Sequence, residues 1–180
     1  MSWDKAITFT LRWEGGFVCD PLDSGGATNR GITQATLDAA FRSGIVSHHD
    51  VKKLSKDEAI AIYKARYWEP YNWGQYGGPV DMIMFDMAVN HGMGGTAKIA
   101  QRACVSLEVP VKVDGKWGPE TWNALYSLSQ NNVRVLAKML LIKRLNFYGN
   151  IVASKPSQAK FLKGWCRRTS ALAVAAGVNV

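Results

Sequence analysis

The spacing of apolar positions along the chain predicts a mostly helical protein. In residues 79–92, a proline at a favourable first helical position precedes apolar side chains on almost every face. A helix that is apolar nearly all round is typical of the centre of a fold. Residues 131–150 are amphipathic instead, with their apolar side chains on one side. We therefore expect the first of these helices to be buried and the second to be exposed along one side.

Start and stop signals delimit further helices. Ser2 is a suitable N-cap for a first helix, which the glycine pair at 15–16 ends. Ser55 and Glu58 have the spacing of a capping box, and Pro70 limits the helix that they begin. The same signals predict helices over 94–107, 118–128 and 155–177.

Only two stretches indicate strands. Residues 17–33 are rich in turn-forming residues and could form a short hairpin, and residues 109–115 could form one strand. The glycine-rich stretch 71–79 is the best candidate for a hinge between an N-terminal lobe and the helical remainder. The predicted fold class is therefore mostly α, with a small β or irregular element near the N-terminus.

Charge is distributed unevenly along the chain. There are 22 Lys and Arg residues against 14 Asp and Glu, and no acidic residue follows Glu120. A segment of one sign favours an anionic partner, such as nucleic acid, anionic lipid or an acidic cell-wall polymer. The alternative is a solvated basic face with no dedicated partner. No nucleic-acid-binding motif accompanies the charge, so we do not expect a nucleic-acid partner.

Cysteine content and targeting signals bear on the compartment. Three widely spaced cysteines, Cys19, Cys104 and Cys166, are not a disulfide framework, and we expect free thiols. The first residues lack the features of a secretory signal, and the apolar C-terminal tail is too short to span a bilayer. We therefore expect synthesis in the cytoplasm without a Sec signal, and no stable membrane insertion.

Residues 12–33, RWEGGFVCDPLDSGGATNRGIT, hold the candidate chemistry. Glu14 is expected in the last turn of the first helix, where the helix dipole and aromatic neighbours favour a protonated carboxyl, as a general acid requires. Asp23 lies in a polar loop that would keep it ionised, and Thr28 could orient a water. An ordinary helix exit followed by an ordinary turn would also give this pattern, so these residues alone leave a catalytic pair open.

The same stretch resembles the signature of the family 108 glycoside hydrolases, N-acetylmuramidases found in phage lysis cassettes and bacterial secretion loci. It also resembles, more loosely, the Glu…Asp…Thr arrangement of phage lysozymes. YKARYWEPYNW and MFDMAVNHGMGGTAKIAQRA are similar to the family's cleft helices, and VDGKWGPETWNAL to the start of its C-terminal peptidoglycan-binding region. The resemblance implies a lysozyme-like fold of two lobes around a cleft. It implies a catalytic domain over 1–110 and a helical peptidoglycan-binding subdomain over 111–180.

The activity implied by this resemblance is hydrolysis of the β-1,4 bond between N-acetylmuramic acid and N-acetylglucosamine. Glu14 would be the general acid, no cofactor would be needed, and Asp23 would assist, with Asp20 as its rival in the same loop. The enzyme would act in the periplasm or cell wall, after holin-like or dedicated release, in phage-type lysis or in secretion of a protein or toxin. The alternatives are a lytic transglycosylase and a non-catalytic peptidoglycan-binding secretion factor.

Further side chains are candidates for contact with the polymer. Tyr67 and Trp68 could stack on sugar rings or fill a packed hinge. Asn90 could bond an N-acetyl group, because an amide is both donor and acceptor. Trp117 could grip the glycan or simply pin the subdomain. We expect no metal site, even at the pair His48–His49, and a monomer whose partners are glycan strands and stem peptides.

Overall fold

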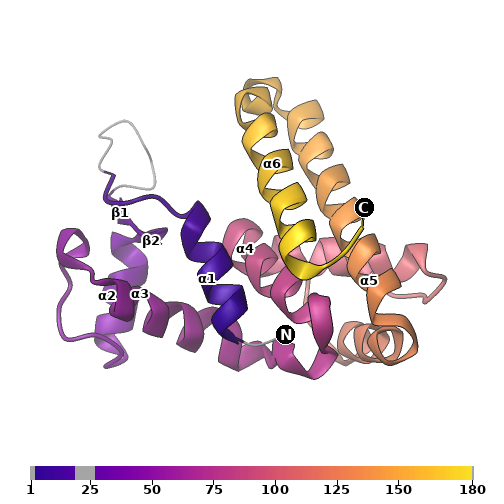
Figure 1. Ribbon diagram of the computed structural model, residues 1–180, viewed down its shortest axis with the longest axis horizontal. Helices are drawn as coiled ribbons and strands as arrows, with labels where there is room; N and C mark the ends of the chain where they lie inside the picture. Colours follow the sequence, from indigo (N-terminus) through magenta and orange to yellow (C-terminus); the bar gives the residue numbers. More distant parts are fainter. Residues whose placement is uncertain (1–2, 19–26, 180) are drawn as a thin grey trace. The chain divides into compact units, whose positions relative to one another are not determined.

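The structure is a computed structural model that describes residues 3–18 and 27–179 (Figure 1). The chain divides into two compact units. We call Ile7–Asn72 the hairpin unit, and Met1–Ala6 together with Trp73–Val180 the helical unit. These units differ from the expected segments 1–110 and 111–180, because helix α4 (Gly78–Ser106) packs extensively against later helices of its own unit. A functional boundary near residue 110 stays a prediction.

The hairpin unit contains short elements. Helix α1 (Trp3–Trp13) belongs to this unit from Ile7 onward and ends just before Glu14, whose backbone N–H donates to the carbonyl of Thr10 at 3.2 Å. The elements that follow are β1 (Thr28–Asn29), β2 (Ile32–Thr33), α2 (Gln34–Arg42), η1 (Val51–Lys53), α3 (Lys56–Tyr63), η2 (Lys64–Trp68) and η3 (Glu69–Tyr71). The predicted hairpin thus forms as two paired strands of two residues each.

Side chains cap two helices of this unit. Ser55 and Glu58 form the predicted capping box at the start of α3, and these hydrogen bonds from Ser55 lower the pKa of Glu58. Helix α2, which the sequence patterns did not reveal, begins behind Thr33, whose hydroxyl accepts from the N–H of Thr36 at 3.2 Å. Because α2 follows β2 directly, its cap also fixes where the hairpin ends.

The helical unit contains η4 (Trp73–Tyr76), α4, α5 (Pro119–Ser154), η5 (Pro156–Gln158) and α6 (Ala159–Ala176). The predicted helices over 79–92 and 94–107 are the two halves of α4, joined at Gly92 with φ 65°. Two further predicted helices join at Asn132 within α5 in the same way. The C-terminal half of α5 and α6 run side by side (Figure 1), and the rings of Tyr148 and Trp165 stack with centroids 4.9 Å apart.

The strand expected over 109–115 does not form. Gln101 of α4 takes up the backbone groups that a neighbouring strand would have bonded. Its side-chain oxygen accepts from the N–H groups of Asp114 and Gly115, and its amide nitrogen donates to the carbonyl of Lys116 at 2.9 Å. The segment is therefore a loop held against α4 by one buried side chain.

Two of the C-terminal arginines do not contribute to the expected basic surface. Arg144 of α5 and Arg168 of α6 are both buried, and each donates to the carboxylate of Asp86 of α4 at 2.7 Å. Burial raises the pKa of Asp86, but the charges and hydrogen bonds of the two arginines outweigh it and hold that pKa below its usual range. This cluster of three charges links α4, α5 and α6.

We expect Arg168→Ala to lower the free energy of unfolding by about 1.5–3 kcal/mol, because it removes charge-assisted hydrogen bonds that the buried Asp86 carboxylate accepts. The matched variant Arg167→Ala removes an exposed arginine from the same helix and should change stability by less than about 0.5 kcal/mol. Urea denaturation of both variants measures the difference, and equal losses would contradict the structural role of Arg168.

The same cluster predicts a pH dependence. A carboxyl group whose pKa is lowered by folding stabilises the protein above its unfolded pKa of about 3.9. That stabilisation is lost as the pH falls through the lower folded pKa. Wild-type stability should therefore fall in acid more steeply than that of Arg168→Ala, which lacks one of the two charges that lower the pKa of Asp86.

Candidate active site

A tight turn positions the candidate catalytic residue. Strands β1 and β2 pair antiparallel with Asn29 opposite Ile32, which leaves Arg30 and Gly31 as a two-residue turn. Both have positive φ, 53° and 75°, as the type I′ hairpin turn requires. The buried side chain of Asn29 donates to the carbonyl of Val51 at 3.0 Å, which ties the hairpin to η1.

Glu14 lies against this turn. A Cβ built on Gly31 would come within 2.5 Å of the Glu14 carboxylate oxygen Oε2 and would also collide with the Tyr63 hydroxyl. Only glycine fits between these two groups. The Tyr63 hydroxyl donates to the carbonyl of Arg30 at 2.8 Å, and the Tyr63 side chain is buried at the end of α3. Residues from α1, the hairpin and α3 therefore meet at one place in the hairpin unit.

The predicted glycine pair has a different role from Gly31. A Cβ on Gly15 or Gly16 would meet no described atom within 4 Å, and neither glycine has a positive φ. Among the described residues, no atom therefore crowds the backbone directly after Glu14. Gly31, and not Gly15 or Gly16, is the glycine whose backbone the Glu14 carboxylate and the Tyr63 hydroxyl approach closely.

The other two predicted catalytic residues are placed less directly. Thr28 is half-buried in β1, and its N–H donates to the carbonyl of Val18 at 2.8 Å. It is three residues from Gly31 in the sequence. Asp23, and its rival Asp20, lie outside the described residues. The roles of all three stay predictions.

Tyr67 and Trp68 lie in the hairpin unit, where α3 widens into the π-helical turn η2. Both are half-buried, and the ring of Tyr67 lies 6.0 Å from that of Tyr63. Irregular turns of this kind are frequent at functional sites. Tyr67 thus lies beside Tyr63, which bonds the turn next to Glu14. This position is compatible with stacking of Tyr67 on a sugar ring.

Asn90 belongs to the helical unit, near the bend of α4. Its side-chain oxygen accepts from the Tyr148 hydroxyl at 3.1 Å, so the amide is already held by the fold. The ring of its neighbour His91 contacts the rings of Phe147 and Tyr148, with centroid distances of 5.2 and 5.1 Å. Burial, with the charge of Arg144, lowers the pKa of His91 to about 3, which keeps the ring neutral at physiological pH.

Trp117 is part of an aromatic cluster in the helical unit. Its ring stacks on Trp122 at 4.4 Å and meets the fully buried Trp73 edge-on at 5.6 Å. Its Nε1 donates to the carbonyl of Met93 at 3.0 Å. These contacts pin the loop before α5 to α4, which was one of the two roles expected for Trp117. Contact with glycan stays a prediction.

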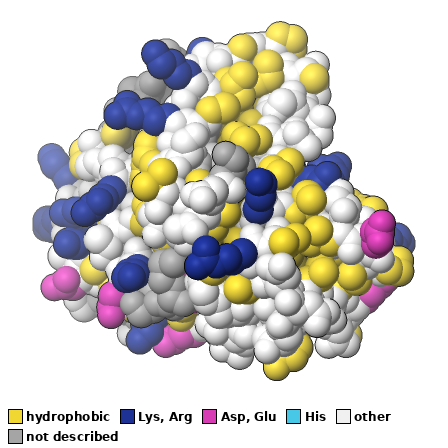
Figure 2. Space-filling view, turned by 45° about the vertical axis from the view of Figure 1, so that its right-hand side comes forward, with side chains coloured by type: hydrophobic (Ala, Val, Ile, Leu, Met, Phe, Trp, Pro, Cys, Tyr) yellow, Lys and Arg dark blue, Asp and Glu magenta, His cyan; other side chains and the backbone are white. Residues whose placement is uncertain are grey.

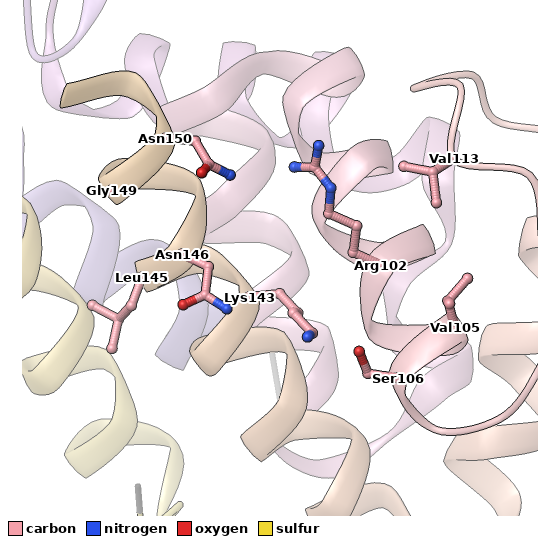
Figure 3. Close-up of a pocket in the computed structure, with 9 residues that line it drawn as sticks. All are labelled: Arg102, Val105, Ser106, Val113, Lys143, Leu145, Asn146, Gly149 and Asn150. Atoms are coloured by element: carbon pink, nitrogen blue, oxygen red, sulfur yellow. The ribbon is translucent and has the colours of Figure 1, made fainter. Parts of the chain in front are cut away.

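A pocket of about 540 Å³ lies between α4 and α5 in the helical unit (Figure 3). Arg102 and Ser106 line it from α4, and Lys143, Asn146 and Asn150 line it from one face of α5. Apolar side chains complete the wall, and no acidic side chain lines it. The pocket therefore offers cations and amides together, which suits a ligand that carries carboxylate and peptide groups.

The wider surface has the same sign. Lys and Arg side chains are spread over the face shown in Figure 2, whereas Asp and Glu side chains are confined to small areas of it. Arg144 and Arg168 are buried, but the other basic residues after Glu120 are mostly exposed, namely Arg134, Lys138, Lys155, Lys160, Lys163 and Arg167.

No metal cluster forms in the described part of the chain. His48 pairs with Glu58, with 3.2 Å between Nε2 and Oε1, and His49 lies beside the ring of Phe41. In the described residues, no helix is long and apolar enough to cross a membrane.

Two protein families match separate parts of the chain. The family described as Glycosyl hydrolase 108 matches residues 7–92, which include Glu14, Gly31 and Tyr63. The chain belongs to the family 108 glycoside hydrolases. A second family, described as Predicted Peptidoglycan domain, matches residues 96–170, which include the whole pocket of Figure 3.

The solved structure of SagA from Brucella abortus is similar over nearly the whole chain. The two share 32% sequence identity with a TM-score of 0.74, and the match covers 97% of this chain and 92% of SagA. The predicted mostly α, lysozyme-like fold is thereby confirmed. No curated protein matches the sequence. The first match shows that the protein is a glycoside hydrolase, and the second shows that peptidoglycan is its partner.

Two residues of the site were missed by sequence reasoning, Tyr63 and Arg30. Tyr63 was hidden because it comes from α3, far along the chain, and only folding brings its hydroxyl to the turn. Arg30 carried a usable signal, since an Arg-Gly pair between two short β-like stretches is compatible with a two-residue hairpin turn.

We expect Gly31→Ala to destabilise the protein by about 1–2 kcal/mol, because alanine disfavours positive φ. It should also displace the Glu14 carboxylate, since the new methyl group would occupy the space against which that carboxylate lies. Gly16→Ala is the matched control, because its methyl group meets no described atom. Thermal unfolding and a crystal structure of each variant measure both effects, and an unmoved Glu14 in Gly31→Ala would contradict this packing.

Proposed function

We propose that this protein is an N-acetylmuramidase that hydrolyses the β-1,4 bond between N-acetylmuramic acid and N-acetylglucosamine, with Glu14 as general acid. The observation that carries the proposal is the packing of the Glu14 carboxylate on the Gly31 turn beside Tyr63, inside the segment that matches the glycosyl hydrolase family. A general acid must be held in one place relative to the bond it protonates, and this packing restricts Glu14 on one side.

The chain's own residues divide the chemical work. Glu14 donates its proton to the glycosidic oxygen as the bond from that oxygen to the anomeric carbon breaks, and a water adds to that carbon and gives one proton to a second carboxylate. Tyr63 holds the turn through the carbonyl of Arg30 and so positions Glu14 indirectly. Asp23 or Asp20 would be the second carboxylate, and Thr28 would orient the water. No described atom lies within 4 Å of a Cβ built on Gly15 or Gly16, which is compatible with a polymer passing there.

Wall binding would use the helical unit. The pocket of Figure 3 presents Arg102 and Lys143 together with amide side chains, and stem peptides carry carboxylates and peptide bonds. We infer that this pocket contacts stem peptides while the hairpin unit cuts the glycan. The enzyme would then serve lysis or secretion through the wall, acting in the periplasm.

Glu14→Gln should reduce peptidoglycan hydrolysis by about 10²–10⁴-fold, because glutamine cannot donate the proton, while the protein stays folded. The assay digests purified peptidoglycan and identifies the released muropeptides by mass spectrometry. Glu120→Gln, an exposed glutamate of α5, is the matched control and should keep wild-type activity.

The products of this digestion test the proposal further. Reducing muramic-acid ends that contain an added water support hydrolysis, whereas anhydro-sugar ends would identify a lytic transglycosylase. Equal release by wild type and Glu14→Gln would exclude Glu14 as the acid. No release by either protein, with retained binding to sacculi, would favour the non-catalytic secretion factor.

The double variant Arg102→Gln/Lys143→Gln should bind isolated sacculi about tenfold or more weakly, because it removes both cations from the pocket. Lys163→Gln/Arg167→Gln removes the same charges from the exposed side of α6 and is the matched control. A sedimentation assay with sacculi at constant ionic strength compares them. Equal weakening by both pairs would show that overall charge, and not this pocket, is responsible.

A further inference from the structure

A second basic pocket lies in the hairpin unit, next to the Arg30–Gly31 turn. It has a volume of about 380 Å³ and is lined by Arg12 of α1, Arg30 of the turn and Lys56 of α3. Thr8 adds a hydroxyl group, and the remaining wall consists of Ile7, Leu11 and Ile60. Three cations from three separate segments thus meet at one cavity, and none of its lining residues is acidic.

These cations have no carboxylate partner in the described part of the chain. Lysine and arginine side chains on a surface of this kind repel one another unless an anion lies between them. Arg30 is the most constrained, because its Nε is buried and finds no hydrogen-bond partner among the described residues. A buried donor without a partner costs free energy, and a bound anion would remove that cost.

The backbone of Arg30 gives a second indication. Its φ of 53° lies in the left-handed region, where glycine or asparagine is favoured over arginine. A residue that breaks a local rule in this way often has a functional reason to be there. Arg30 lines the pocket, and neither glycine nor asparagine could supply a positive charge there.

The pocket is mechanically connected to the candidate acid. The carbonyl of Arg30 accepts from Tyr63, and the next residue, Gly31, is the one against which the Glu14 carboxylate packs. An anion that fixes the Arg30 side chain would therefore restrict the turn on which Glu14 rests.

We propose that this pocket binds a small oxyanion, a carboxylate or phosphate group, between Arg12, Arg30 and Lys56, and that the bound anion stabilises the turn beneath Glu14. The anion could be free in solution or could be a carboxylate of the muramoyl peptide. Binding itself does not depend on the proposed function; only its consequence for hydrolysis rests on that function.

The test is a titration of ¹⁵N-labelled protein followed by NMR at constant ionic strength. The probes are inorganic phosphate, N-acetylmuramoyl-L-alanyl-D-glutamate, and the same compound with both carboxylates amidated. We expect saturable shifts of the Arg30 and Gly31 amide signals with at least one of the two anionic probes, and none with the amidated compound. Saturation by phosphate alone indicates a free anion, and tighter saturation by the muramoyl peptide indicates a substrate carboxylate.

Arg12→Gln/Lys56→Gln leaves the turn intact and should weaken binding about tenfold or more. Arg42→Gln/Lys52→Gln removes the same charges from exposed positions of the same unit and should bind as wild type does. The proposal is overturned if no anion gives saturable shifts, if the amidated compound binds equally well, or if both double variants bind alike. Glu14→Gln should still bind the anion, so loss of hydrolysis and loss of binding are separable.

Discussion

Asp86 is fully buried in α4, and its carboxylate accepts hydrogen bonds from Arg144 of α5 and Arg168 of α6. None of the three charges would be tolerated at this depth alone, because a buried ion without a partner costs several kcal/mol. The three charges therefore stabilise the packing of α4, α5 and α6 together. Tyr148 extends the cluster, since its hydroxyl accepts from Arg144 and donates to Asn90. This hydrogen-bond network connects the core of the helical unit to Asn90, near the bend of α4.

The hairpin unit depends on a steric constraint instead. Gly31 lets the Glu14 carboxylate and the Tyr63 hydroxyl approach the backbone more closely than any side chain would allow. The Tyr63 hydroxyl bonds the carbonyl of Arg30 within the turn, and the Asn29 side chain bonds the carbonyl of Val51. Several contacts therefore determine the geometry of the turn. A site built in this way is held in position before substrate binds. A general acid transfers its proton to a substrate most efficiently when its position is fixed in advance.

Local sequence signals predicted helix starts correctly where a single capping residue or proline determines the start. The Ser55–Glu58 capping box and the proline before the buried helix both predicted real starts, because capping and proline geometry act within a single turn. The prediction of a strand over 109–115 was wrong, because a distant side chain, Gln101, took the backbone hydrogen bonds. Contacts of that kind have no local signature.

The sequence by itself determined the mostly α composition, the short hairpin and the candidate acid Glu14, since helical periodicity, turn chemistry and the family motif are all contained in short stretches. Only the tertiary structure decided which charges are exposed. Arg167 and Arg168 are neighbours in the sequence, yet one is exposed and the other is buried against Asp86. A one-residue step along a helix rotates a side chain by about 100°, so its surroundings are set by how the helix packs.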